Sequence, residues 1–119
     1  MYCMAEVVRL WVIGGVLQMC KLFYLFAVMW VTMNVSAYTE TGNRMANEEY
    51  PHIGACAVDK INGEWIKFGT LITLPDGRVL TVTDRFGGGF TDKLDIFMET
   101  ESECWKWGRK WLLCKIELP

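Results

Sequence analysis

Apolar residues are concentrated near the start of the chain. Between Val7 and Met33 the only charged residues are Arg9 and Lys21, whereas charges are frequent from Glu40 onward. This asymmetry predicts an export or membrane-anchoring segment followed by a globular domain, because a single soluble core would not gather its apolar residues at one end.

The apolar segment has three interpretations. A transmembrane helix from Leu10 to Val31 is long enough to span a bilayer, with Lys21 near its centre at a cost on the order of a few kcal/mol. A signal peptide beginning at Met19 would contain the apolar run LFYLFAVMWVTM and end with the small-residue pattern VSA at Ala37. The third interpretation is a buried core helix. We predict that residues 1–37 are a signal peptide or anchor and that residues 38–119 form one exported domain.

After this segment, short β-type runs alternate with turn signals. The runs TLITL and RVLTVTD flank the turn PDG, so residues 70–84 are predicted as a β-hairpin. Thr100 and Glu103 have the spacing of a capping box and predict a short helix that ends at Gly108. Further strands are predicted at residues 53–59, 93–98 and 110–118. Many short strands with one short helix indicate a mainly β protein built as a small barrel.

Composition restricts the classes of function. The chain has 119 residues, a formal net charge of −2 and no basic stripe, so nucleic acid is not expected as a partner. No CxxC pair or histidine cluster suggests a metal site, and His52 is expected in a loop. The predicted domain has three cysteines, which in an oxidising compartment predict one disulfide and one free thiol. Trp105, Trp107 and Trp111 have helix and strand spacing, which favours core positions over sugar stacking.

Several motifs occur together in a recognisable order. SAYTETGN, GACAVD, FGT, VTDRFGGGF, KLDIFM and CWKWGRKWL follow one another between Ser36 and Leu112. In order and spacing they resemble the landmarks of the three-aspartate (3D) domain family. The resemblance implies a double-psi β-barrel, the fold shared with the catalytic domain of membrane-bound lytic transglycosylase A and found in stationary-phase muralytic factors. The chain departs from the family pattern in the loop DRFGGGF, in KFGT and in RMANEEY.

The resemblance also implies a set of site residues. The three aspartates of the family correspond to Asp59, Asp84 and Asp95, with Asp95 and Asp84 as the principal catalytic pair. Residues that correspond to the substrate groove are Tyr38, Thr39, Gly69, Thr70, Gly87 and Gly88. Glycines in the loop would keep side chains out of the groove and let backbone amides approach a glycan.

Lytic cleavage of peptidoglycan gives these carboxyls a chemical role. An acid must protonate the glycosidic oxygen, and a base must then take the proton from the C6 hydroxyl of N-acetylmuramic acid as a 1,6-anhydro ring closes. One carboxyl can serve both steps. Asp95 lies between Leu94 and Ile96, and partial burial with Asp84 nearby would raise its pKa as this role requires.

Each aspartate also has a structural interpretation. Asp59 can be a turn residue, Asp84 can cap the glycine-rich loop, and Asp95 can face solvent on an alternating strand. We expect an exported or membrane-anchored lytic transglycosylase that faces the cell wall and works as a monomer without metal or cofactor. Its partner would be the glycan strand, with membrane contact only through the N-terminal segment. The alternative is a non-catalytic module that binds cell-wall glycan or has a structural role.

The resemblance further implies a disulfide. In the clostridial members that this sequence resembles, cysteines recur at the positions of Cys56 and Cys104. A bridge between them would join the strand that leads to Asp59 to the short helix. Cys114 is then the free thiol, although a Cys56–Cys114 bridge and three reduced cysteines remain open.

Overall fold

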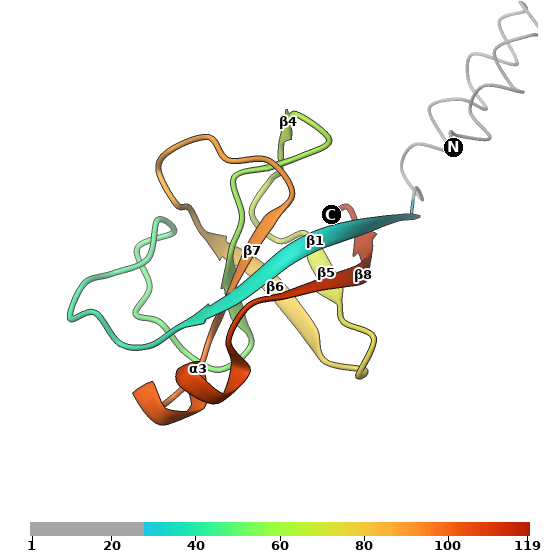
Figure 1. The fold of residues 1–119 in the computed structure, drawn as a ribbon. Coiled ribbons are helices and arrows are strands. Elements are labelled where there is room, and N and C mark those ends of the chain that lie inside the picture. Colours follow the sequence, from blue (N-terminus) through green and yellow to red (C-terminus); the bar gives the residue numbers. More distant parts are fainter. Residues whose placement is uncertain (1–27) are drawn as a thin grey trace, which may run out of the picture.

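The computed structural model describes residues 28–119, which form a closed barrel of six strands, a two-stranded hairpin and one short helix (Figure 1). The barrel strands, in chain order, are β1 (Val28–Tyr38), β2 (Ala55–Ala57), β5 (Leu71–Thr73), β6 (Val79–Asp84), β7 (Lys93–Phe97) and β8 (Lys110–Glu117). The remaining elements are β3 (Lys60–Ile61), β4 (Glu64–Trp65) and α3 (Glu101–Trp107). A mainly β protein with a small barrel and a single short helix was expected, and the described residues confirm it.

The barrel closes in the order β1-β7-β2-β6-β5-β8, with β8 returning to β1. Two of the neighbouring pairs, β1–β7 and β2–β6, are parallel, and the other pairs are antiparallel. The predicted hairpin at residues 70–84 is present as β5 and β6. Strands that are distant in sequence are therefore neighbours, and this mixed order determines which side chains share a face.

The longest strand, β1, has 11 residues and lies between β7 and β8. Its Val31, Met33 and Val35 point into the core at alternate positions, as a strand with one buried face requires. The boundary predicted between residues 37 and 38 falls inside this strand, so the folded unit includes Val28 to Ala37. The sequence did not reveal this strand because the overall apolarity of the segment conceals the two-residue periodicity of the run. The rest of the predicted signal or anchor segment lies outside the described residues.

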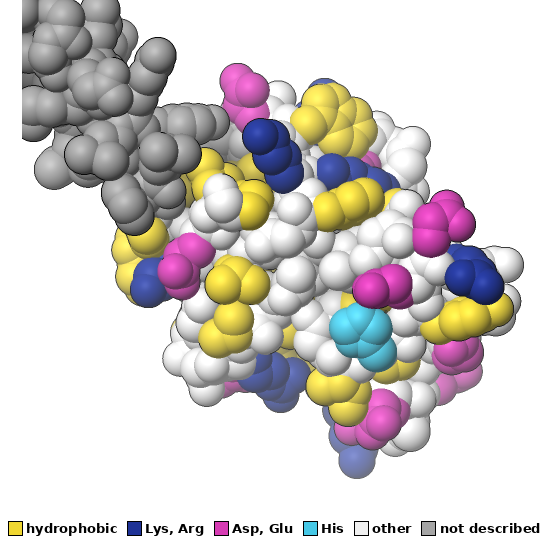
Figure 2. Space-filling view, turned by 180° about the vertical axis from the view of Figure 1, so that it is seen from behind, with side chains coloured by type: hydrophobic (Ala, Val, Ile, Leu, Met, Phe, Trp, Pro, Cys, Tyr) yellow, Lys and Arg dark blue, Asp and Glu magenta, His cyan; other side chains and the backbone are white. Residues whose placement is uncertain are grey.

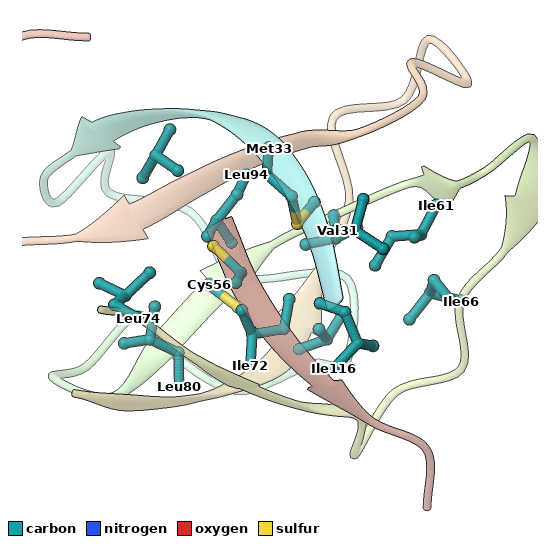
Figure 3. Packing of buried hydrophobic residues seen from close by; sticks show 14 of the residues in the cluster. Val31, Met33, Cys56, Ile61, Ile66, Ile72, Leu74, Leu80, Leu94 and Ile116 are labelled. Atoms are coloured by element: carbon teal, nitrogen blue, oxygen red, sulfur yellow. The ribbon is translucent and has the colours of Figure 1, made fainter. Parts of the chain in front are cut away.

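Side chains fill the interior of the barrel (Figure 3). Fully buried residues from all six strands meet there: Met33, Val35, Cys56, Ile72, Val82, Leu94, Cys114 and Ile116. A barrel of this size has room for side chains alone, so its centre is a packed core. Any site must therefore lie on the outer face or at an end. Within residues 28–119, no helix is long and apolar enough to cross a membrane.

The short helix α3 begins as the sequence predicted. Thr100 accepts a hydrogen bond from the Glu103 amide, and Glu103 accepts one from the Thr100 amide, so the capping box is complete. The helix packs against β1, and the Trp107 indole donates to the Val35 carbonyl oxygen at 3.4 Å. It thereby covers one part of the barrel wall next to β1.

The predicted Cys56–Cys104 disulfide is wrong in this structure. Cys56, Cys104 and Cys114 are all free. Cys56 points into the barrel core from β2, whereas Cys104 lies on α3, which packs on the outside of β1. The barrel wall separates the two positions, so packing α3 against the sheet does not bring their sulfurs together.

Candidate functional site

A row of side chains crosses four strands of the barrel wall. Ser36 on β1 lies opposite Asp95 on β7, Asp95 lies opposite Ala57 on β2, and Ala57 lies opposite Asp84 on β6. A register shift between Cys56 and Ala57 places Asp84 at this level. Residues directly opposite one another in a ladder share a face. Two strand spacings therefore separate the Cα atoms of Asp95 and Asp84 by about 10 Å.

Asp95 is half-buried, and its carboxyl accepts a hydrogen bond from the Ser36 hydroxyl at 3.0 Å. Burial is the main reason that the pKa of Asp95 is raised, and the charge of Asp84 adds to the effect. The Ser36 hydrogen bond and the charges of Lys93 and Arg109 act in the opposite direction without cancelling it. Asp95 is thus a carboxyl that holds its proton more firmly than an exposed aspartate.

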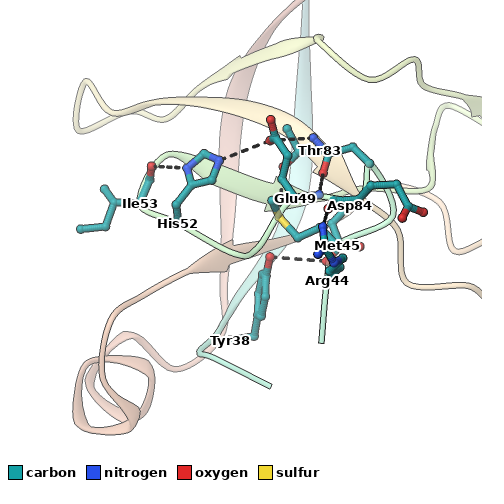
Figure 4. Close-up of polar contacts among 10 residues, drawn as sticks. Tyr38, Arg44, Met45, Glu49, His52, Ile53, Thr83 and Asp84 are labelled. Atoms are coloured by element: carbon teal, nitrogen blue, oxygen red, sulfur yellow. Dashed lines mark hydrogen bonds and ion pairs between the residues drawn. The ribbon is translucent and has the colours of Figure 1, made fainter. Parts of the chain in front are cut away.

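Asp84 is held in place by three donors. One carboxylate oxygen accepts from the Ala46 and Arg85 amides at 2.9 and 2.8 Å. The other accepts from the Tyr38 hydroxyl at 3.5 Å, as Figure 4 shows. Burial raises the pKa of Tyr38, and the charges of Asp84 and Asp95 raise it further. Tyr38 therefore lies close to both carboxyls and stays protonated as a donor. The resemblance assigned Tyr38 to the substrate groove, and in the structure its hydroxyl donates to Asp84.

Asp59 has a different environment from the other two aspartates. Its side chain is 0% exposed and accepts hydrogen bonds from the amides of Phe86, Gly89 and Phe90 at 2.8, 2.7 and 3.2 Å. Burial alone would raise the pKa of Asp59, but the backbone donors outweigh burial and the pKa is lowered. These contacts make Asp59 the anchor of the glycine-rich loop and leave it outside the row, contrary to the catalytic role expected from the resemblance.

The glycine-rich loop is organised around that anchor. Gly87 and Gly89 have φ values of 90° and 71°, a conformation that favours glycine. A side chain at Gly88 would come within 2.5 Å of the Phe90 ring. Arg85 reaches inward and donates to the carbonyl oxygens of Val58 and Ile66. Amides of this loop that were expected to face a substrate instead bind Asp59, so the glycines serve the fold of the loop.

The other predicted groove residues make local contacts. Thr39 donates to the Glu99 carbonyl oxygen at 3.1 Å, near the end of β7. The Gly69 amide donates to the Val82 carbonyl oxygen, and Thr70 is fully buried with its hydroxyl on the Lys67 carbonyl oxygen at 2.7 Å. Gly69 and Thr70 thus form a structural turn, and the structure does not bring them into the row.

Sequence reasoning missed Ser36 and Arg109. Ser36 was assigned to the expected cleavage pattern, and only the parallel register of β1 and β7 shows that it faces Asp95. Beside this pair lies a shallow hollow of about 380 Å³ lined by Ser36, Ala37, Cys104, Trp105, Gly108 and Arg109. A polar ligand that enters the hollow would meet the Ser36–Asp95 pair at one edge.

In residues 28–119 no group of three or more His, Cys, Asp or Glu side chains is placed to hold a metal ion. His52 lies in an exposed loop, where Nδ1 is 2.9 Å from the Ile53 carbonyl oxygen and Nε2 is 3.7 Å from a Glu49 carboxylate oxygen (Figure 4). The loop position expected for His52 is confirmed.

The pKa of Asp95 should move in opposite directions in two variants. Asp84→Asn removes a negative charge and should lower it, whereas Arg109→Ala removes a positive charge and should raise it. Titration of the Asp95 carboxyl carbon by NMR measures both shifts. Lys106→Ala, which removes a positive charge from the last turn of α3, is the control. Shifts of the same sign in the two variants would contradict the assigned environment.

Asp59→Asn should destabilise the protein at neutral pH. The asparagine side chain has a single, uncharged acceptor oxygen, so it cannot accept hydrogen bonds from all the loop amides that bind Asp59. Each buried amide left without a partner costs about 1–3 kcal/mol. A lowered folded-state pKa means that Asp59 contributes stability above its unfolded pKa of about 3.9 and loses it as the pH falls through the folded value. Urea unfolding should therefore show a large difference from wild type at pH 7 that narrows in acid. Glu64→Gln is an exposed control.

No protein-family model and no curated protein matches the chain. Support for a function comes from the sequence motifs and from the geometry of the Ser36–Asp95–Ala57–Asp84 row.

Proposed function

We propose that this protein is a peptidoglycan lytic transglycosylase on a double-psi β-barrel, with Asp95 as its general acid and base. The observation that carries the proposal is the half-buried Asp95 with its raised pKa, which shares one face with Asp84. The closed six-strand barrel with two parallel pairs supports the double-psi architecture. The motif order in the sequence supports the substrate class.

The reaction proceeds without water. Protonated Asp95 gives its proton to the glycosidic oxygen as the bond from C1 of N-acetylmuramic acid to that oxygen breaks. The resulting carboxylate then takes the proton of the C6 hydroxyl, whose oxygen attacks C1 and closes the 1,6-anhydro ring. Asp95 is protonated again at the end. The products are an N-acetylglucosamine hydroxyl and a 1,6-anhydromuramyl end, so atoms and protons balance.

The neighbours of Asp95 have supporting roles. Ser36 orients the carboxyl through its 3.0 Å hydrogen bond. The negative charge of Asp84 helps to keep Asp95 protonated before the reaction and favours the positive charge that develops at C1 during bond cleavage. Its three hydrogen-bond donors keep Asp84 in place for this electrostatic role. A glycan that crosses the row at Ala57 would pass between the two carboxyls.

One observation favours the alternative, a non-catalytic module that binds glycan. Amides of the glycine-rich loop are bound to Asp59, which leaves fewer backbone donors to hold a reacting sugar. Such a module would still attach to the cell wall but would not cleave it. The two functions differ in their products, which makes them separable in one experiment.

Incubation of the purified full-length protein with peptidoglycan tests the proposal. Mass spectrometry should detect 1,6-anhydromuropeptides that increase with time. Reducing N-acetylmuramic acid ends in their place would show a hydrolase and overturn the proposal. Co-sedimentation with cell-wall sacculi without any cleavage product would support the binding module. The protein would act outside the cytoplasm as a monomer.

A further inference from the structure

The outer face of β1 and β8 carries an exposed apolar stripe, formed by Trp30, Leu113 and Trp111. Their side chains are 62%, 52% and 68% exposed. The antiparallel register places Leu113 opposite Thr32 and Trp111 opposite Asn34, so on one face Leu113 lies diagonal to Trp30 and two positions from Trp111 along β8. At the Trp30 end, Val28 and Leu71 extend the apolar surface and are also partly exposed. Trp111 was expected in the core, and its exposure shows that this expectation was wrong.

Seen from behind, the barrel shows basic and acidic side chains interspersed with apolar ones (Figure 2). On the β1–β8 face, Lys115 lies opposite Trp30, but its ammonium is 3.5 Å from the Glu117 carboxylate, so the local charge is balanced. Three large apolar side chains on two paired strands are a surface that a soluble protein usually covers.

The sequence before β1 indicates what covers it. Residues 10–27, directly before Val28, contain one charge, Lys21. As a helix, such a segment would measure about 27 Å, close to the thickness of the hydrocarbon core of a bilayer. Lys21, six residues before Ala27, would extend its long side chain toward the interface at the Val28 end. Val28 and Trp30 would follow at the level of the lipid headgroups, where tryptophan is enriched.

We propose that the stripe of Trp30, Leu113 and Trp111 rests on a lipid bilayer, so that the barrel lies with its β1–β8 face on the membrane. Membrane contact was expected only through the N-terminal segment, and the stripe adds the folded domain itself. Trp side chains suit this position because their rings are apolar and their indole N–H can bond to headgroups or water. The inference does not depend on the proposed enzymatic activity.

A second copy of the chain fits this surface less well. A standard protein interface buries about 800 Å² on each partner, and three half-exposed side chains supply much less. A bilayer needs no shape complementarity and accepts a narrow stripe. Asp95 lies on β7, on the opposite side of β1 from β8, so β1 separates the two carboxyls of the row from the β8 part of the stripe. The orientation is thus compatible with a polymeric substrate.

Quenching by brominated lipid tests the orientation. Two full-length variants keep either Trp111 or Trp105 as the sole tryptophan, with the others changed to Phe, and are placed in phosphatidylcholine–phosphatidylglycerol vesicles. Trp105 on α3 is the matched control because it is 80% exposed and lies off the stripe. Bromine on the acyl chains should remove most of the Trp111 emission and little of the Trp105 emission. Iodide dissolved in the water should quench the Trp105 emission more than the Trp111 emission.

Equal bromine quenching of the two tryptophans would overturn the proposal. Protection of Trp111 from both bromine and iodide would also overturn it. A protein surface would then cover the stripe, either the N-terminal segment or a second copy of the chain. If the multiple variants fail to fold, Trp111→Phe and Trp105→Phe in the otherwise unchanged chain give the same comparison. Loss of Trp111 should lower the bromine-quenched fraction, and loss of Trp105 should raise it.

Discussion

Asp95→Asn is expected to abolish release of 1,6-anhydromuropeptides while the barrel stays folded. The amide keeps the size of the carboxyl and can still accept the hydrogen bond from Ser36, so the local packing changes little. It cannot carry a proton to the glycosidic oxygen or take one from the C6 hydroxyl. Loss of general acid–base catalysis typically costs on the order of 10²–10⁴-fold in rate. Initial rates of product formation, measured by mass spectrometry, give the effect directly.

A matched control separates chemistry from charge and folding. Asp76 lies in the exposed turn between β5 and β6, where it pairs with Arg78 at 3.2 Å. Asp76→Asn makes the same chemical change away from the row and should retain wild-type activity. Circular dichroism should show the same folded barrel in both variants. Wild-type product formation by a folded Asp95→Asn protein would end the assignment of Asp95.

Local signals in the sequence predicted the local elements well. The turn PDG between two apolar runs gave the β5–β6 hairpin, and the capping box gave α3 with Gly108 at its end. The alternating run at residues 93–98 contains β7, which places Leu94 and Ile96 inside and Asp95 outside. In each case a few adjacent residues determine the backbone, so a single sequence is sufficient.

The site depends on contacts that are distant in sequence. Ser36 and Asp95 are 59 positions apart, and only the parallel β1–β7 ladder brings them together. Asp59 looks like a site aspartate by position, but its hydrogen-bond donors lie 27 to 31 residues downstream. Periodicity does not show which loop folds back onto a carboxylate. The sequence therefore indicated the three aspartates together, whereas the contacts separate Asp59 from the other two.

The strand β1 shows the opposite limitation. Its residues are apolar enough to continue the segment before them, and overall hydrophobicity masked the alternation of Val31, Met33 and Val35. A run that can be read as the end of an export signal and as a buried strand cannot be assigned from composition alone. In the folded protein, pairing with β7 and β8 makes this run a strand of the barrel.

A chain that begins at Tyr38 is therefore expected not to fold, whereas a chain that begins at Val28 should form the barrel. Removal of β1 leaves β7 and β8 without their shared neighbour and opens the barrel. It also removes Val31, Met33 and Val35 from the core, each worth about 1.5–3 kcal/mol of burial. Their sum is comparable to the 5–15 kcal/mol by which a typical domain is stable. Circular dichroism and thermal unfolding of the two chains measure the difference.

Two point variants on β1 provide the control for this deletion. Met33 is fully buried, whereas the adjacent Thr32 is exposed on the outer face. Met33→Asp, like the deletion, should leave the chain unfolded and without a cooperative thermal transition, because a carboxylate would enter the packed core. Thr32→Asp should leave the thermal transition nearly unchanged. A cooperative transition in the chain that begins at Tyr38 would show that β1 is dispensable, and cleavage after Ala37 would then be compatible with a folded domain.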